Sequence, residues 1–300
     1  MANTVTYETL FEKELQERLA RPQNWREVCK VEMTNTRVIT SQSISTAGDW
    51  AAVATLTRGT AFDPTDVAEV ADTLTVSTGR HVTTYFDFAD LAQSPWTNER
   101  EIFSRAGERL GEFIETDVLA QHASWRNIGL VAGVWTDNDA SAGAASASNI
   151  DDLARLVRRV IREQNGASLM ARNGAFAVVS PTSFEFVEAF AQANGFASAD
   201  EALKNGLAPQ VKYLGLTWYV SNDNTADHAM AGIRKVQRLG ILKGTFGKLH
   251  KFPGIAGTSG GIQSGIAYHS RVDIGHLTPT DHAALVLDVN DSNSCLVIKN

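Results

Sequence analysis

The segment 257–261 has the residue types and the spacing of a nucleophilic serine site. It matches G-x-S-x-G, the nucleophile elbow of α/β-hydrolases, with Ser259 as the nucleophile. An aspartate and a histidine follow in the chain order of that fold, in two possible pairs: Asp273 with His276, or Asp281 with His282. The elbow requires a strand before the serine and a helix after it, to hold the hydroxyl on a strained turn. Here a proline and a glycine precede the motif and a β-like segment follows, so the context argues against a hydrolase.

Three other candidate sites are weaker still. Residues 240–248 suggest a phosphate-binding P-loop, but Leu242 stands where the motif needs glycine and Leu249 replaces the magnesium-binding serine or threonine. Glu112 and Glu115 share the face of an expected helix, where solvated carboxylates paired with surface cations are the ordinary interpretation. Four histidines lie in one region, none at the i, i+4 spacing of a helical metal site: His250, His269, His276 and His282. We therefore expect no catalytic residue, no metal and no cofactor.

The composition is that of a chain that can bury a large core without disulfides. At 300 residues and 43% hydrophobic, the length permits one large domain or two modest ones. Cys29 and Cys295 form no C-x-x-C or Cys/His cluster, which fits a reducing compartment. The N-terminus carries charges where a signal peptide needs an apolar stretch, and the longest uncharged apolar run, 129–135, is too short to span a bilayer. We expect a soluble, cytosolic protein with no membrane partner.

The charge is distributed unevenly. A net charge of −7 argues against a surface built as a whole to grip nucleic acid. From residue 228 to 272 there is no acidic residue, whereas seven basic ones occur: Arg234, Lys235, Arg238, Lys243, Lys248, Lys251 and Arg271. We expect these side chains to form a solvated face or one half of inter-subunit salt bridges, or else to contact nucleic acid or an acidic assembly partner.

The elements expected at the start of the chain contain few bulky apolar residues with which to form a core of their own. Residues 8–20 have helical spacing of apolar residues before Pro22, and residues 31–46 favour an extended arm. Residues 49–88 predict a long polar hairpin with its turn at 62–70. Two long strands with so few bulky apolar residues are marginal alone, so we infer that the hairpin packs on something outside its own domain.

The strongest helix signal spans residues 95–122. Ser94 can serve as its N-cap with Pro95 at the first helical position. Apolar residues follow at alternating steps of three and four: Phe103, Ala106, Leu110, Phe113 or Ile114, and Val118. At about 1.5 Å per residue this helix would be a rod on the order of 40 Å long, which makes it a spine.

Residues 149–222 favour a compact α/β unit after a small polar linker at 141–149. Its expected elements are a helix opened by Ser148 and Asp151 and ended at 165–166, a strand at 175–180, a helix with Thr182 and Glu185 as capping box, a short helix with Ser198 and Glu201, and a strand at 211–220. Beyond it we expect a helix at 226–239, a glycine-rich stretch, and β segments at 263–275, 282–289 and 294–299.

The chain thus has a definite order of elements: an arm, a long polar hairpin, a spine helix, an inserted α/β unit and a return to β segments. This order resembles the HK97-fold major capsid proteins of tailed bacteriophages over nearly the whole chain. Residues 82–120 look like that family's E-loop return strand and spine helix, and residues 175–189 and 214–223 look like its A-domain units. The resemblance implies an α+β fold with an N-arm (1–48), an E-loop (49–90), a P-domain (91–148 and its return strands 250–300) and an A-domain (149–249).

The resemblance also implies a function and partners. Many copies would close into an icosahedral shell as hexamers and pentamers, assembled in the host cytoplasm, with a portal at one vertex and room for a decoration protein. Packaged double-stranded DNA would be contacted weakly and without sequence specificity. We expect six charged residues of the hairpin and spine to make assembly contacts: Arg58, Asp63, Asp66, Arg80, Arg100 and Arg105.

Two features depart from some members of that family. Some relatives form a Lys-Asn cross-link from the E-loop, but residues 46–90 contain no lysine, so we predict no such cross-link. There is no long helical N-terminal extension of the kind used as a built-in scaffold, so we expect a separate scaffolding protein.

Three rival interpretations stay open at this point. A cellular encapsulin-like compartment shares the fold. A serine hydrolase using Ser259 belongs to a different class. A generic soluble binding domain is the third, but a monomer would leave the arm and the hairpin without contacts.

Overall fold

The computed structural model describes most of the chain. The described residues are 23–45, 68–87, 99–121, 126–132, 134–137, 145–163, 167–193, 210–222, 228–253, 265–277 and 295–299. The helices in these ranges are α1 (Trp25–Val28), α3 (Glu99–Ala120), α4 (Ile150–Glu163), α5 (Ala167–Asn173) and α6 (Pro181–Ala193). Helix α3 has 22 residues and is therefore about 33 Å long. It is the expected spine.

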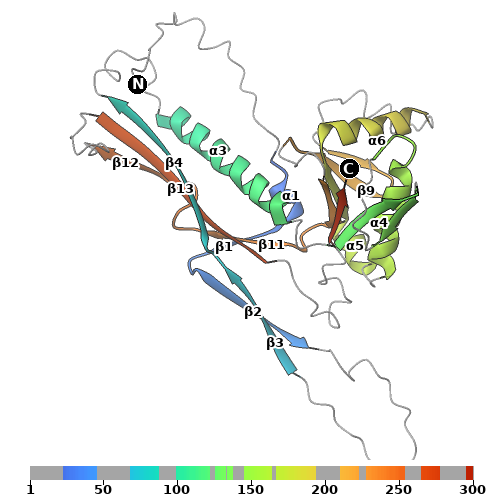
Figure 1. Cartoon of the computed structure of the whole chain (residues 1–300). Helices are drawn as coiled ribbons and strands as arrows, with labels where there is room; N and C mark the ends of the chain where they lie inside the picture. Colours follow the sequence, from blue (N-terminus) through green and yellow to red (C-terminus); the bar gives the residue numbers. More distant parts are fainter. Residues whose placement is uncertain are drawn as a thin grey trace, which may run out of the picture.

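The first sheet lies beside this spine helix (Figure 1). Its strands are β1 (Lys30–Thr34), β4 (Thr78–Asp87), β11 (Arg238–Leu242), β12 (Leu249–Pro253) and β13 (Gly265–Leu277). β13 is the long central strand: β4 pairs along one edge, while β11 and β12 pair with successive parts of the other. Alternate residues of β13, such as Tyr268, Val272 and Ile274, are buried, and α3 packs against the strand.

The second sheet forms the core of the α/β unit. Its strand order is β6-β5-β14-β10-β7-β9-β8. The strands are β5 (Arg126–Val131), β6 (Val134–Asp137), β7 (Ala175–Val179), β8 (Gln210–Tyr213), β9 (Leu216–Val220), β10 (His228–Ile233) and β14 (Cys295–Lys299). Helices α4 and α6 pack on it, and every residue of β7 is buried. One continuous core joins this unit to the spine, from Trp218 and Val157 to Ile114 and Leu239.

The third sheet is a two-stranded hairpin of β2 (Val38–Ser45) and β3 (Ala68–Thr75). Figure 1 shows it projecting away from both larger sheets. The predicted hairpin at 49–88 was therefore misplaced. Its outgoing strand lies within the segment predicted as an arm, and β4, expected to be part of the hairpin, leaves it to pair with β13. The cause is that β4 pairs with β13, which lies far along the chain and which local periodicity cannot indicate.

Several predicted elements are confirmed. Helix α4, strands β7, β13 and β14, and the spine helix lie where local periodicity placed them. The caps differ. Asn149 precedes α4 and its Oδ1 accepts from the Ser146 N–H at 2.8 Å. Helix α6 begins two residues earlier than predicted, because Ser180 Oγ accepts the Ser183 N–H at 3.2 Å and serves as its cap.

Two predictions were wrong. The expected strand at 211–220 is a hairpin of β8 and β9, turned by Leu214 and Gly215, both at positive φ (53° and 77°). The expected helix at 226–239 contains β10 and the start of β11. The domain boundaries at 149 and 249 also differ from sheet membership, since β5, β6 and β14 join the α/β sheet and β11 joins the other.

Some predictions lie outside the described residues. They are the helix at 8–20, the Ser94 and Pro95 cap, the short helix with Ser198 and Glu201, the motif around Ser259, and the segment 282–289.

Candidate functional site

Two glycines, Gly240 and Gly275, lie in close contact with the base of the hairpin. We call this contact the seat of the hairpin. Where β3 reaches the first sheet, Leu74 is fully buried and Val76 is nearly so. A Cβ on Gly240 of β11 would lie 2.3 Å from Leu74 Cδ2, and a Cβ on Gly275 of β13 would lie 2.1 Å from the Thr75 carbonyl oxygen. No larger residue fits at either position without movement. The glycines thus let β3 lie directly on the sheet and fix where the hairpin leaves it.

Beyond this seat the hairpin has few means of stabilising itself. Its two strands pair along eight residues each, and in the described part of the chain no other strand pairs with them. β2 has no charged residue, while β3 carries Glu69 and Asp72 opposite Ile44 and Ser41. An isolated two-stranded ladder is marginal in water, and its free edges can accept further pairing. The hairpin therefore favours a partner outside this chain.

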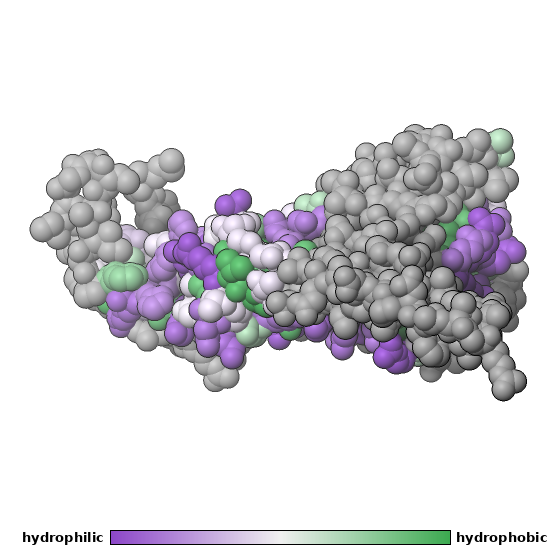
Figure 2. Space-filling model, turned by 90° about the horizontal axis from the view of Figure 1, so that it is seen from below, coloured by the Kyte–Doolittle hydropathy of each residue, from purple (hydrophilic) through white to green (hydrophobic). Residues whose placement is uncertain are grey.

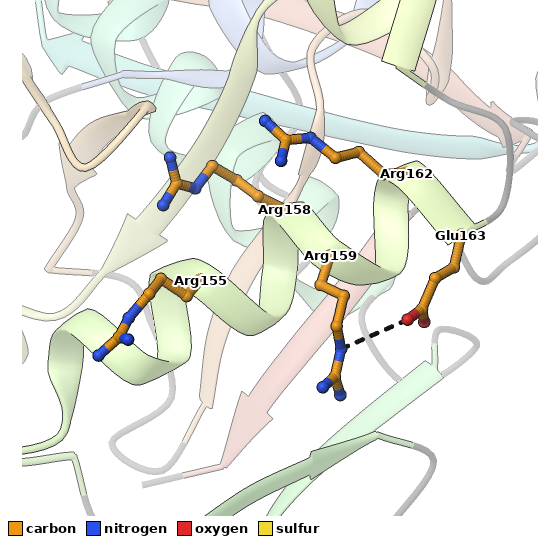
Figure 3. Close-up of a pocket in the computed structure, with 5 residues that line it drawn as sticks. All are labelled: Arg155, Arg158, Arg159, Arg162 and Glu163. Atoms are coloured by element: carbon orange, nitrogen blue, oxygen red, sulfur yellow. Dashed lines mark ion pairs between the residues drawn. The ribbon is translucent and has the colours of Figure 1, made fainter.

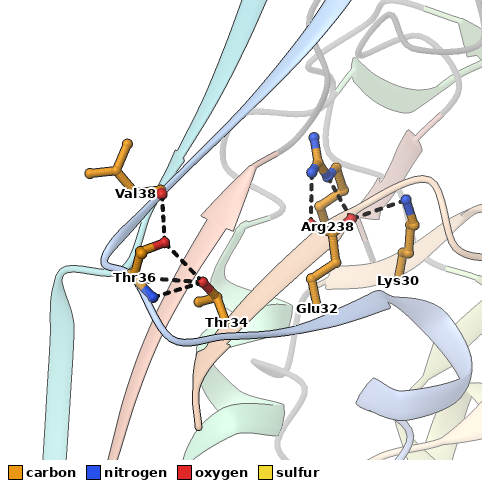
Figure 4. Close-up of polar contacts among 6 residues, drawn as sticks. All are labelled: Lys30, Glu32, Thr34, Thr36, Val38 and Arg238. Atoms are coloured by element: carbon orange, nitrogen blue, oxygen red, sulfur yellow. Dashed lines mark hydrogen bonds and ion pairs between the residues drawn. The ribbon is translucent and has the colours of Figure 1, made fainter. Parts of the chain in front are cut away.

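A semi-buried ion pair holds β1 to β11 near the base of the hairpin (Figure 4). Arg238 Nε and Nη2 donate to Glu32 Oε1 and Oε2 at 3.1 and 2.7 Å, and Lys30 Nζ lies 3.0 Å from Oε1. Partial burial would raise the pKa of Glu32, but the hydrogen bonds and charges of Arg238 and Lys30 outweigh it and lower that pKa below 4.5. This pair thus stabilises the fold above pH 4.5, and the contribution is lost as the pH falls through the lowered pKa.

The turn from β1 to β2 is held by threonines (Figure 4). The Thr36 N–H donates to Thr34 Oγ1 at 3.0 Å, and the Thr36 hydroxyl donates to the Val38 carbonyl at 2.9 Å. These bonds stand in for the ladder bonds that are missing at the turn, and so define the direction in which β2 departs.

Arg238→Ala is expected to lower the free energy of unfolding of the unassembled chain by about 1–3 kcal/mol, because it leaves the Glu32 carboxylate partly buried without its bidentate partner. Urea unfolding at pH 7 measures this. Arg159→Ala is the control: both side chains of its ion pair with Glu163 are about 60% exposed, so its loss should cost under about 0.5 kcal/mol. Equal losses in both variants would contradict the assigned role of the Arg238 pair.

Glu115 joins three parts of the chain at one buried point. It lies on α3, is 1% exposed, and its Oε2 accepts the N–H groups of Asn24 and Trp25 at 2.9 and 2.8 Å. The Asn24 side chain in turn donates to the Val220 carbonyl of β9 at 3.0 Å. Burial raises the pKa of Glu115 to about 7, since these hydrogen bonds offset only part of the desolvation. The carboxyl group therefore ties the start of α1 to the spine and to the α/β unit.

This placement corrects the prediction that Glu112 and Glu115 are both surface residues. Glu112 does pair with the exposed Arg109, at 3.0 Å, but its own side chain is only 17% exposed. Glu115 instead follows Ile114 in the buried stripe of the helix, and no partner within one helical turn signals its role. Its partners are about 90 residues away in the sequence.

The predicted assembly contacts are only partly described. Arg58, Asp63 and Asp66 lie outside the described residues. Arg80, on β4, is exposed and its guanidinium stands 5.2 Å from the centre of the Phe113 ring, over the spine. Arg100 and Arg105 lie on the first half of α3, and Arg105 is exposed. Their part in assembly stays a prediction.

The aspartate and histidine that could complete a serine site contact other side chains. Arg271 donates to Asp273 Oδ1 at 2.7 and 3.0 Å, and His276 Nε2 contacts Asp117 of the spine helix. The pair Asp273 and His276 is thus not arranged as an Asp–His relay, because each side chain is engaged elsewhere.

The histidines are closer together than their sequence spacing suggests. His250 on β12 stands directly opposite His269 on β13, and the His81 ring lies 5.2 Å from that of His269. Burial and the charges of His81, His250 and Arg271 lower the pKa of His269. Within the described ranges no three His, Cys, Asp or Glu side chains are arranged to hold a metal ion.

Three of the seven basic residues at 228–272 are paired within the chain. Arg234 contacts Glu27, Arg238 contacts Glu32 and Arg271 contacts Asp273. These three cations are therefore halves of salt bridges within the chain, whereas the sequence had suggested salt bridges between subunits.

The surface has no single large apolar area in the view of Figure 2, where hydrophilic and hydrophobic residues alternate over the described part of that face. The large apolar side chains that are exposed lie on separate elements: Met33, Val38, Phe103 and Phe252. In the described part of the chain, no helix has the length and apolar character needed to cross a bilayer.

Comparison with known proteins identifies the fold. No protein-family model matches the sequence, and no curated protein matches it. Solved structures do match along nearly the whole chain. A structure from Mycobacterium phage Che8 has a TM-score of 0.62 at 12% identity and covers 99% of this chain and 98% of its own. The mature capsid of bacteriophage PhiM1 has a TM-score of 0.61 at 16% identity, covering 98% and 92%.

A third match is the crystal structure of a virus-like particle from Pyrococcus furiosus. It has a TM-score of 0.50 at 12% identity and covers 91% of this chain and 90% of its own. The phage structures thus match better and over more of the chain than this particle does. The predicted α+β, HK97-type capsid fold is confirmed.

Proposed function

We propose that this chain, which has the HK97 capsid fold, is the major capsid protein of a tailed bacteriophage. The observation that carries the proposal is the phage structure that matches 99% of this chain with 98% of its own length. The two chains thus align over nearly their whole lengths, which supports a shared role in building a shell. Hexamers and pentamers of the chain would form an icosahedral shell around a double-stranded DNA genome.

The hairpin supports this proposal on physical grounds. A two-stranded element of small and polar residues, seated on glycines and pointing away from its own body, is completed by burial against a neighbouring copy. In this function the contacts between subunits hold the shell together, and no side chain acts on a substrate. We expect a separate scaffolding protein during assembly in the host cytoplasm, a portal at one vertex and, in the mature virion, room for a decoration protein.

The contents of purified particles test the proposal against a cellular compartment. Particles isolated from an infected host and treated with nuclease should contain protected double-stranded DNA of genome length. DNA-free particles that instead hold a single abundant enzyme would support the compartment, which the lower match to the virus-like particle does not favour.

A denaturing gel of boiled particles tests the absence of a lysine cross-link. Because residues 46–90 contain no lysine, the chain should migrate as a single band near 32.5 kDa. A ladder of covalent oligomers that survives boiling and reducing agent would contradict this prediction.

A further inference from the structure

Helix α4 borders a pocket lined mainly by arginines. Its lining consists of four arginines and one glutamate (Figure 3): Arg155, Arg158, Arg159, Arg162 and Glu163. The pocket has a volume of about 460 Å³, which is that of a site for a small ligand. The apolar residues of the helix, among them Val157 and Ile161, are buried on its other side. The arginines therefore stand on the outer face of the α/β unit.

Two of the arginines are paired with carboxylates of their own helix. Arg155 contacts Asp151 and Asp152 at 2.6 and 2.5 Å. Arg159 Nε stands 3.5 Å from Glu163 Oε1. These are all the carboxylates of α4, so the helix itself offers no further anion to the other two arginines.

Arg158 has no carboxylate partner in the part of the chain that the structure describes. It lies against the β8–β9 turn, where a Cβ on Gly215 would meet its Cδ and Nη1 at 3.0 Å, so the turn restricts the direction of the side chain. Its Nε is buried and has no hydrogen-bond partner among the described residues. Native structures rarely leave a buried donor unused, so this guanidinium group favours an acceptor from outside the chain.

Arg162 stands one helical turn beyond Arg158, and the two side chains extend in the same direction (Figure 3). Arg162 is exposed, and none of the described carboxylates pairs with it. Like charges four residues apart on a helix repel each other. An anion held between the two guanidinium groups removes this repulsion, and each planar fork can donate two parallel hydrogen bonds to it. The pair is therefore arranged to bind an oxyanion.

The charge of the pocket favours a polyvalent anion. Four cations and one anion line it, and a single carboxylate would neutralise only one of these cations. A phosphate group carries about two negative charges and three acceptor oxygens, and a polyphosphate joins several such groups. Long DNA fits less well, because three carboxylates stand on the same helix and the whole chain has a net charge of −7.

From these observations we propose that the arginine pocket of α4 binds a compact polyphosphate anion, such as inorganic triphosphate or the triphosphate group of a nucleotide. Arg158 and Arg162 hold one phosphate group between them. Arg159 turns from its surface pair with Glu163, which is weak, to the next phosphate group. The inference goes beyond the proposed shell function and does not depend on it, because every residue of the site belongs to one helix of one chain.

Binding of inorganic triphosphate to the full-length, unassembled chain tests this site. Isothermal titration calorimetry should show one triphosphate bound per chain. Arg158→Gln with Arg162→Gln should weaken the affinity at least about tenfold, because both substitutions remove charge-assisted hydrogen bonds. Arg158→Lys with Arg162→Lys keeps the charge but loses the planar forks, and should weaken the affinity about threefold.

Two further variants control for charge and for folding. Arg37→Gln with Arg172→Gln also removes two exposed arginines, but neither lines the pocket, so the affinity should stay within about twofold of the wild type. Because Arg158 packs on the β8–β9 turn, Arg162→Gln alone is the variant to use if circular dichroism shows that the double variant does not fold. Its side chain is exposed, and its loss should still weaken binding at least about threefold.

Three outcomes would overturn the inference. Equal losses of affinity in the glutamine variant and in the control would reduce the binding to a general effect of positive charge. Failure of triphosphate to bind the wild-type chain would remove the proposed site. Tighter binding of short duplex DNA or of polyglutamate than of triphosphate, dependent on Arg158 and Arg162, would assign the pocket to nucleic acid or to an acidic protein segment. None of these outcomes bears on whether the chain forms shells, so the capsid function is tested separately.

Discussion

Gly275→Ala is expected to reduce shell assembly at least about tenfold and to destabilise the seat of the hairpin by about 3 kcal/mol, the upper end of the usual cost of overpacking. The added Cβ would lie 2.1 Å from the Thr75 carbonyl oxygen and 2.9 Å from Val76 Cα. These are backbone atoms, so the clash cannot be relieved by rotating a side chain. The base of β3 must shift, and the whole hairpin shifts with it.

Two further glycines provide a graded series for this experiment. Gly240→Ala would meet Leu74 Cδ2 at 2.3 Å, the end of a side chain that can rotate, so its effect should be smaller. Gly244→Ala, with no heavy atom within 4 Å of the new Cβ, should behave like the wild type. Hydrogen exchange of residues 68–76 in the unassembled chain reports on the seat, and sedimentation reports on the shells. Wild-type behaviour of all three variants would contradict the proposed seat.

The second large effect is a dependence of stability on pH that comes from Glu115. Its pKa is about 7 in the folded chain and near 4.5 when the chain is unfolded. A raised pKa means that the folded state binds the proton more tightly, so the stabilisation is fully present below pH 4.5 and is lost as the pH rises through 7. The difference corresponds to about 3 kcal/mol between pH 4.5 and pH 8.

Comparing Glu115→Gln with the wild type isolates this contribution from those of other groups. The glutamine keeps an oxygen that can accept from Asn24 or Trp25 but does not titrate. Urea unfolding of the unassembled chain should therefore show a loss of stability between pH 4.5 and 8 that is about 3 kcal/mol smaller in the variant. Thr116→Ser, at the exposed next position of the same helix, changes no titrating group and should keep the wild-type slope. Parallel pH profiles for Glu115→Gln and the wild type would show that Glu115 does not titrate in this range.

The parts of the fold that the sequence predicts well are those whose signal is local. Helix α4 carries a complete apolar stripe, and β7 is a short apolar run whose residues are all buried in a sheet interior. The order of hairpin, spine and α/β unit was likewise predictable, and the confirmed capsid fold is consistent with it, but the segment 31–46 predicted as an arm forms β1 and β2. The caps of α4 and α6 were missed by one or two residues, because several neighbouring residues can accept the same hydrogen bond.

The wrong predictions concern segments whose strand partners lie far away in the sequence. β10 lies between β7 and β14, and β11 between β1 and β13, so partners far along the chain override the local helical pattern at 226–239. The base of the hairpin depends on Gly240 and Gly275, whose importance lies in what they allow β3 to approach. Only the Leu214-Gly215 turn had a usable local signal, since a glycine at the second position of a two-residue turn is common between hairpin strands.

Glu115 illustrates the same limit at the level of a site. A glutamate three residues after Glu112 on a helix with charged neighbours is usually a surface residue. Glu115 is buried because Asn24 and Trp25, about 90 residues earlier in the chain, bring N–H groups to it. A sequence pattern within one helix cannot reveal such a partner.

The most direct test of the central claim is the mass of the purified chain, expressed alone and together with the scaffolding protein that we propose, measured by light scattering and examined by negative-stain microscopy. We predict closed shells or capsomers of megadalton mass when the scaffolding protein is present. A well-behaved monomer of 32.5 kDa under both conditions would contradict the account.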